Sequence, residues 1–458
     1  MHTKIRLISF GFMLVFASTG CDVVKPLPDS RADGVVVEVA AFEGGYGIHW
    51  HQKVATQYSA LNVERNASAV VWGDPRVSEK VKPRILRGDP PNLILDNRIP
   101  IWLMIATEKL APFDSELDKP AWGLEQENVT WREMFAPGML DIYEAYGKVY
   151  AIPTSYGAWG CWYNARLFRE HGWETPKTWS EFEVLCQKIL DAGISPIAYQ
   201  GKYPYYGWYT YFSLLHRCGG LAAINRANGC EPGAYSHPDA IWAARLMQEM
   251  SQRYFQKGAL AMNHTESQLE FVNDNAALIF CGVWLENEMK SSTPPDFEMR
   301  CFTVPGVEGG KGNPLLFNGQ GMEYVFASSD APNLDEALRF CNYMMSRENG
   351  PDMANAISVI SPIKGAAPRE ALSPALQSVL DIIDASPSTF SDRVSTLLLE
   401  WFNQVMQPCM SALLSGEITP EEFGRRMDAG IEASRQNPDV IIPPFRAYDG
   451  AKYGEPVS

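Results

Sequence analysis

The chain has 458 residues, of which 46% are hydrophobic and 20% charged, and it is long enough to form two domains. Its formal net charge of −15 argues against nucleic acid or an anionic lipid surface as the main partner, because both need a basic protein surface. Aromatic residues make up 12% of the chain. Many must be core, but exposed tryptophan and tyrosine rings also stack on flat apolar faces.

Residues 1–21 are typical of an export signal rather than of folded structure. A short basic start precedes an apolar run over 7–16, which is too short to span a bilayer. Cys21 follows small residues in a pattern that resembles a bacterial lipobox, although Ser18 stands where leucine is usual. We expect Cys21 to be the lipidated first residue of the mature chain; the alternative is an ordinary secretory signal with a chance cysteine. Residues 22–33 read as a flexible tether.

Three apolar runs in the first third predict parallel strands. They cover Val35 to Ala41, Val70 to Trp72 and Asn92 to Leu95, and the first is nearly continuous, as in a sheet buried on both faces. A glycine-rich loop over 42–47 follows the first run and leads into an amphipathic segment that ends near Tyr58. Glycines placed between a strand and a helix can bring backbone N–H groups close to a ligand, although a plain turn is the more frequent outcome.

Polar residues follow the third of these runs. Asp96 and Arg98 come directly after Leu95. Ligands of open α/β sheets bind at the carboxyl ends of the strands, so both side chains are candidates for a binding site. A solvated surface turn is an equally good interpretation.

The middle of the chain predicts a strand, an aromatic loop and a helix. The strand covers 149–152 and is ended by Pro153, and the loop that follows is rich in tryptophan and tyrosine over 156–163. Thr178 and Glu181 have the spacing of a capping box, which begins a helix that we expect to end at Gly193.

The second half mixes helices, one further strand and irregular segments. The aromatic cluster over 199–209 is broken by glycine and proline, which favours a loop that presents rings over core packing. We predict helices over 236–255, 333–350 and 388–414, and a last helix that begins at Thr419-Pro420. The apolar run 276–280 predicts a strand, and Gly282-Val283-Trp284 follows it.

Eight cysteines remain after residue 21, and an exported location permits disulfides. Cys218 and Cys230 bracket a glycine-rich segment and are the best candidates for a pair, whereas buried free thiols are as good an interpretation for the others. His49 and His51 lack a clear third ligand cluster, so we predict no metal site and no cofactor. No Gly-x-Ser-x-Gly elbow or P-loop is present in the sequence.

Three segments, in order and at the right spacing, resemble a signature of the family 1 extracellular solute-binding proteins, the sugar receptors of ABC importers. They are Gly147 to Pro153, Tyr163 to Phe168 and Pro176 to Phe182. The resemblance implies an α/β fold of the periplasmic-binding-protein type, with two lobes and a hinge of about three crossing segments near 151, 318 and 360. The implied limits are 34–150 plus 320–358 for lobe 1, and 154–316 plus 362–458 for lobe 2.

The resemblance also implies a function. A mono- or oligosaccharide would bind between the lobes, and the loaded protein would deliver it to membrane permease subunits. The protein would be a monomer without nucleic-acid partners, held by its lipid anchor at the periplasmic or extracytoplasmic face of the cell membrane. The expected ligand-binding residues are Glu43, Asp96, Arg98, Tyr156, Trp159, Tyr203, Trp208, Trp284, Glu286, Gln320 and Trp401.

An enzyme is the second hypothesis. A glycosidase needs two carboxylates across a cleft, and Glu43, Asp96, Glu286 and Glu323 can in principle supply them. A sugar-binding cleft uses the same carboxylates only as hydrogen-bond acceptors. The absence of a catalytic motif favours binding, with a lipid-anchored surface protein that binds or cleaves glycans as the alternative.

Overall fold

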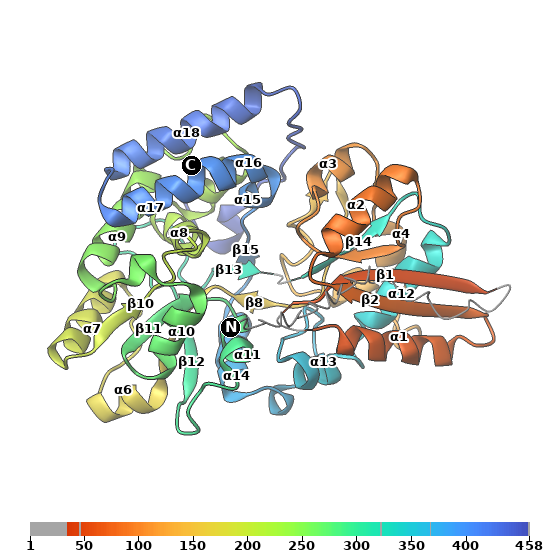
Figure 1. Cartoon of the computed structure of the whole chain (residues 1–458), viewed down its shortest axis with the longest axis horizontal. Helices are drawn as coiled ribbons and strands as arrows, with labels where there is room; N and C mark the ends of the chain where they lie inside the picture. The colour runs from red at the N-terminus through yellow and green to blue at the C-terminus, as the bar shows by residue number, and fades with distance from the viewer. Residues whose placement is uncertain (1–33, 45–46, 321–322, 367, 457–458) are drawn as a thin grey trace, which may run out of the picture.

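The computed structural model describes residues 34–44, 47–320, 323–366 and 368–456. These residues form two α/β lobes that lie side by side, with short strands between them (Figure 1). The predicted signal, the lipidation site Cys21 and the tether lie outside the described residues. No helix in the described part of the chain is long and apolar enough to cross a membrane.

Lobe 1 is built on a mostly parallel sheet with the order β2-β1-β3-β14-β4, to which β7 adds by pairing with β14. Its strands are β1 (Val35–Phe42), β2 (Ala67–Asp74), β3 (Leu93–Leu95), β4 (Leu110–Ala111), β7 (Ile152–Pro153) and β14 (Tyr324–Ser328), beside the hairpin of β5 (Glu144–Ala145) and β6 (Lys148–Val149). Its helices are α1 (His49–Leu61), α2 (Val77–Arg87), α3 (Ile101–Ala106), α4 (Asp114–Leu117), α5 (Trp131–Met134), α12 (Leu334–Met344) and α13 (Gly350–Ile357). β14 runs antiparallel to β3, so the chain re-enters this sheet from lobe 2.

Lobe 2 is built on a second sheet with the order β10-β11-β9-β12. Its strands are β9 (Gly160–Asn164), β10 (Ser195–Ala198), β11 (Ala276–Cys281) and β12 (Met299–Thr303). Its helices are α6 (Ala165–His171), α7 (Trp179–Asp191), α8 (Tyr205–Asn228), α9 (Pro238–Tyr254), α10 (His264–Val272), α11 (Trp284–Met289), α14 (Pro374–Ala385), α15 (Val394–Leu397), α16 (Leu399–Trp401), α17 (Gln407–Ser415) and α18 (Pro420–Gln436). All six residues of β11 are buried, which explains their unbroken apolar run.

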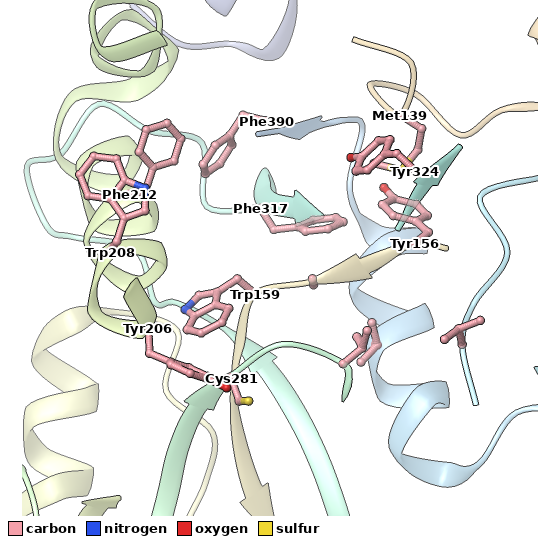
Figure 2. Close-up of a cluster of buried hydrophobic side chains, with 14 of the residues drawn as sticks. Met139, Tyr156, Trp159, Tyr206, Trp208, Phe212, Cys281, Phe317, Tyr324 and Phe390 are labelled. Carbon is pink, nitrogen blue, oxygen red and sulfur yellow. The ribbon is translucent and has the colours of Figure 1, made fainter. Parts of the chain in front are cut away.

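Three chain segments pass between the lobes and lie next to one another. The first includes β8 (Gly157–Ala158), which pairs with β13 (Phe317–Gln320) of the second, and β13 also pairs with β15 (Thr389–Phe390). Tyr156 forms a bridge with Ile360 of the third. Figure 2 shows Tyr156 and Phe317 among the buried side chains of this region, and their rings stack with centroids 6.1 Å apart.

Several sequence predictions about single elements are wrong. The segment 156–163 is not a loop but β8 and β9, and the aromatic cluster over 199–209 includes the start of α8 at Tyr205. The predicted helix over 333–350 is two helices, α12 and α13. Gly350 begins the second rather than ending the first, and Pro351 follows it in the first turn of α13. The glycine is needed there because an added Cβ would lie 2.0 Å from the carbonyl oxygen of Ala366.

The predicted disulfide is also absent. Cys218 and Cys230 are both buried free thiols, as are the six other cysteines of the described chain. The segment between them is mostly the second half of α8, not a loop, and its helical stretch over 221–228 alone spans roughly 12 Å, beyond the reach of a disulfide. Gly220 interrupts this helix with a φ of 65°, which accounts for the glycine at this position.

Candidate functional site

A cavity of about 330 Å³ opens between the lobes and receives residues from both. Its size lies within the roughly 300–1,000 Å³ that is usual for small-molecule sites. Lobe 1 contributes Phe42, Leu95, Asp96, Asn97, Arg98 and Glu323, and lobe 2 contributes Tyr205, Tyr206, Trp284, Asn287 and Glu288. One wall is therefore charged and the other is largely aromatic.

The charged wall lies where two antiparallel strands meet. Leu95 of β3 pairs with Val325 of β14 in an antiparallel register. Asp96, one residue past Leu95, and Glu323, two residues before Val325, therefore lie at the same edge of the sheet. Arg98 donates from Nε to Asp96 Oδ1 at 2.8 Å and from Nη2 to Oδ2 at 3.0 Å. The guanidinium carbon of Arg98 also lies 3.9 Å from the centroid of the Phe42 ring. Asp96 is buried while Arg98 is half exposed, so the pair presents the arginine to the cavity.

Unlike Asp96, Glu323 forms no ion pair within the described chain. Its carboxylate lines the cavity, and burial together with the negative charge of Asp96 raises its pKa to about 7. Within the described chain, only the backbone carbonyl of Glu323 accepts hydrogen bonds, from the amide and the hydroxyl of Thr154. Glu323 can therefore present either a carboxylate or a carboxylic acid near neutral pH.

The aromatic wall is a set of rings held by mutual contacts. Tyr205 and Tyr206 stack with centroids 4.7 Å apart, and Tyr206 meets Trp284 edge to face at 6.2 Å. Trp159 lies behind Trp284, with centroids 5.9 Å apart, and its indole N–H donates to Thr210 at 3.0 Å. Burial raises the pKa of both tyrosines, so their phenols stay protonated and can donate hydrogen bonds.

Gly282 determines where the Trp284 ring lies. The indole folds back over this glycine, and a Cβ at residue 282 would stand 1.9 Å from the ring. Any side chain at position 282 would therefore push the ring from its position. This contact gives a physical reason for the Gly-x-Trp sequence after β11.

The structure brings three of the expected ligand-binding residues to the cavity: Asp96, Arg98 and Trp284. Trp159 supports Trp284 from behind, and Tyr156 lies in the crossing region. Gln320 belongs to β13, where its backbone pairs with Gly157, and its side chain lies outside the described residues. The direct roles of all six of these residues in binding stay predictions.

The other expected residues lie away from the cavity. Trp208 and Trp401 are buried in the core of lobe 2 and meet edge to face; the indole N–H of Trp208 donates to Asp392, and that of Trp401 to the carbonyl of Met427. Glu286 accepts from Ser373 at 2.7 Å on the other side of α11. Tyr203 packs on Tyr205 and His264, and Glu43 is exposed beyond the end of β1.

Six further lining residues were not predicted from the sequence, and Glu323 was a candidate only for an enzyme; the six are Phe42, Asn97, Tyr205, Tyr206, Asn287 and Glu288. The aromatic cluster over 199–209 was a usable signal for the two tyrosines. Choosing among its rings required knowing that α8 begins at Tyr205, because the helix turns Tyr205 and Tyr206 to the cavity and Trp208 to the core.

Within the described chain, no group of three or more histidine, cysteine, aspartate or glutamate side chains is placed to hold a metal ion. His49 and His51 both lie in the first turn of α1. His51 is buried, and burial lowers the pKa of its imidazole to about 4.

The model of the family described as bacterial extracellular solute-binding protein matches residues 50–351. The chain belongs to this family. The diacetylchitobiose-binding protein NgcE of Streptomyces coelicolor is 29% identical over 282 residues, which cover 59% of this chain and 57% of that protein. The multiple sugar-binding protein of Streptococcus mutans is 26% identical over 59% of this chain and 62% of its own length. The match thus spans about three fifths of each relative.

Solved structures of solute-binding proteins share the fold. A chitin oligosaccharide binding protein superimposes with a TM-score of 0.70, at 20% identity, over 88% of this chain and 99% of its own. The architecture is that of maltose-binding-protein-like periplasmic binding proteins, which confirms the predicted fold class.

Proposed function

We propose that this solute-binding protein is the receptor of an ABC importer and binds a mono- or oligosaccharide in the cavity between its lobes. The observation that carries the proposal is the pairing of a ring platform on lobe 2 with hydrogen-bonding side chains on lobe 1. Trp284 and Tyr206 offer flat apolar faces for a sugar ring, while Asp96, Arg98 and Glu323 can bind its hydroxyls.

Contacts from both lobes to one ligand explain how binding would favour a closed form. A ligand shifts a conformational equilibrium only as far as its affinity differs between the two states. A sugar that touches Trp284 and Asp96 together gains both contacts only when the lobes are close. The closed form would then dock on the permease subunits. We infer lobe limits of 34–150 plus 320–358 and 154–316 plus 362–458, with the crossing segments as the hinge.

We infer binding rather than turnover, since the known members matched here are binding proteins. Export, lipidation of Cys21, location at the outer face of the cell membrane and a monomeric state belong to the same proposal. The acidic net charge of −15 is consistent with a surface that avoids nucleic acid and anionic lipid.

The test is a thermal-shift screen of the purified protein against mono- and oligosaccharides, followed by calorimetry on the sugars that shift it. A ligand that binds only the folded state stabilises it by roughly 2.7 kcal/mol at a hundred times its dissociation constant. Trp284→Ala should weaken binding by about tenfold or more, because it removes a central ring of the platform. Trp242→Ala, a partly buried tryptophan of α9 outside the cavity, is the matched control. A protein that responds to no sugar, or that cleaves one, would contradict the proposal.

A further inference from the structure

We propose that the solute carries a protonated amine, as an amino sugar without its acetyl group does, and that Glu323 is the carboxylate that receives the ammonium. This inference rests on the proposed function and deepens it. The charged side chains in the cavity are mostly acidic. Asp96, Glu288 and Glu323 contribute carboxylates, whereas Arg98 is the one basic side chain among the lining residues.

Arg98 already forms an ion pair with Asp96. Two of its nitrogens donate to the two oxygens of that carboxylate, and Nη1 donates to the carbonyl of Pro75 at 3.1 Å. The face of the guanidinium packs on Phe42. The Asp96–Arg98 pair is thus close to neutral as a unit, and the charge of the other two carboxylates is left without a basic partner in the cavity.

Glu288 and Glu323 differ in how well their surroundings stabilise a negative charge that has no basic partner. Glu288 is exposed and accepts a hydrogen bond from Gln268 at 2.7 Å, so water and an amide stabilise its charge. Glu323 is largely buried, and within the described chain its carboxylate accepts no hydrogen bond and forms no ion pair. A buried carboxylate without a partner is costly to ionise, and a closing lobe would remove the water that remains.

A ligand ammonium would supply the positive charge that no described side chain places against the Glu323 carboxylate. Placed against Glu323, it forms a charge-assisted hydrogen bond and neutralises the carboxylate, whereas a neutral hydroxyl would donate a hydrogen bond but leave the negative charge uncompensated. The aromatic wall favours the same ligand, because the faces of Trp284, Tyr205 and Tyr206 attract cations as well as apolar ring faces. An acetylated amine carries no charge and gains neither contact.

The acid–base behaviour of the cavity follows from the same groups. Those that face Glu323 are Asp96 and Arg98 after β3, Glu288 on α11, and the phenols of Tyr205 and Tyr206 on α8. Asp96 opposes the ionisation of Glu323, while the tyrosines stay neutral. An ammonium ligand should therefore draw Glu323 into its ionised form and release its proton, whereas a neutral sugar should leave the proton in place.

The test compares sugars that differ only at the second carbon of the ring. Glucose, glucosamine and N-acetylglucosamine, and their β-1,4-linked dimers, are titrated calorimetrically into the full chain at pH 7, where the free amine is largely protonated. We expect the amine forms to bind about tenfold more tightly than the neutral forms, which corresponds to about 1.4 kcal/mol. Added salt should reduce this preference.

Two variants assign the preference to one residue. Glu323→Gln should abolish the preference for the amine forms, because an amide carries no charge to pair with an ammonium, and circular dichroism with thermal unfolding checks that the variant is folded. Glu288→Gln, the matched carboxylate on the opposite wall, should retain the preference. Neutral sugars that bind as tightly as the amines, or a preference lost in Glu288→Gln instead, would overturn the inference and leave the sugar receptor standing. Binding of none of these sugars, together with no response in the wider screen, would overturn both.

Discussion

Glu323 shows how a single side chain can combine a binding role with a cost to the fold. It lines the cavity without an ion pair in the described part of the chain, and burial beside Asp96 raises its pKa to about 7 from an ordinary 4.5. Between these two values the folded protein binds a proton that the unfolded chain has released. Stability from this residue is therefore fully present at low pH and is lost as the pH rises through 7. A group that only supported the fold would have been paired, as Asp96 is with Arg98.

Replacing Glu323 by glutamine should stabilise the ligand-free protein at alkaline pH. The amide mimics the protonated acid, so at pH 8 the variant avoids a buried charge that costs the wild type on the order of 3 kcal/mol. At pH 5 the two proteins should be nearly equally stable. Urea unfolding at both pH values measures the difference, with Glu288→Gln as the control from the same cavity. A gain of the same size at pH 5 and pH 8 would show that ionisation of Glu323 is not its source.

At the scale of elements, the predictions that held were those with a local physical signal. The capping box of Thr178 and Glu181 begins α7 as expected, and the unbroken apolar run of β11 is a fully buried strand. Predictions failed where packing decided the outcome. The rings of Trp162 and Tyr163 belong to a strand, because β9 pairs with β11 and β12 on its two sides, and no local pattern records that pairing.

The predicted site residues divide in the same way, into those with a local signal and those whose position depends on packing. Asp96, Arg98 and Trp284, which line the cavity, could be selected from the sequence because each follows a strand that the sequence predicts; their roles in binding stay predictions. Trp208 and Trp401 lie in the core of lobe 2 instead, and only the packing of α8 against the C-terminal helices shows that they face each other.

The junction between β11 and α11 gives a test at this scale. Gly282→Ala should displace the Trp284 ring, because a Cβ at this position would lie 1.9 Å from the indole. We expect sugar affinity to fall by about as much as in Trp284→Ala, while secondary structure is retained. Gly306→Ala is the matched control, since its new methyl would meet neighbours only at an ordinary 3.5 Å. Tryptophan fluorescence and calorimetry measure the two effects, and an unchanged affinity in Gly282→Ala would refute the assigned role.

The molecule as a whole is held together partly by its C-terminal segment, which crosses from α18 back along both lobes. Arg446 pairs with Glu144 of lobe 1 at 2.9 Å, and Tyr448 exchanges hydrogen bonds with Asn225 of lobe 2. The segment reaches its most buried point at Glu455, beside the kink of α8. An element remote in sequence thereby completes the helix that carries part of the aromatic wall.

Glu455→Ala should destabilise the protein through this contact. The kink at Gly220 leaves the backbone N–H of Leu221 without a helical partner, and Glu455 accepts from it at 2.5 Å and from the N–H of Asn313 at 2.9 Å. Its carboxylate also lies 2.7 Å from the imidazole of His216. Removing it leaves two buried donors unsatisfied, which should cost about 2–4 kcal/mol of unfolding free energy in urea at pH 7.

Two comparisons separate this hydrogen bonding from a general effect of shortening a side chain. Glu455→Gln keeps one acceptor oxygen and should lose less stability than the alanine variant. Glu417→Ala, at an exposed position, should change the unfolding free energy by less than about 0.5 kcal/mol. If Glu455→Ala were no more costly than Glu417→Ala, the N–H groups at the kink would be satisfied without the C-terminal segment, and that segment would only lie against the lobes rather than complete α8.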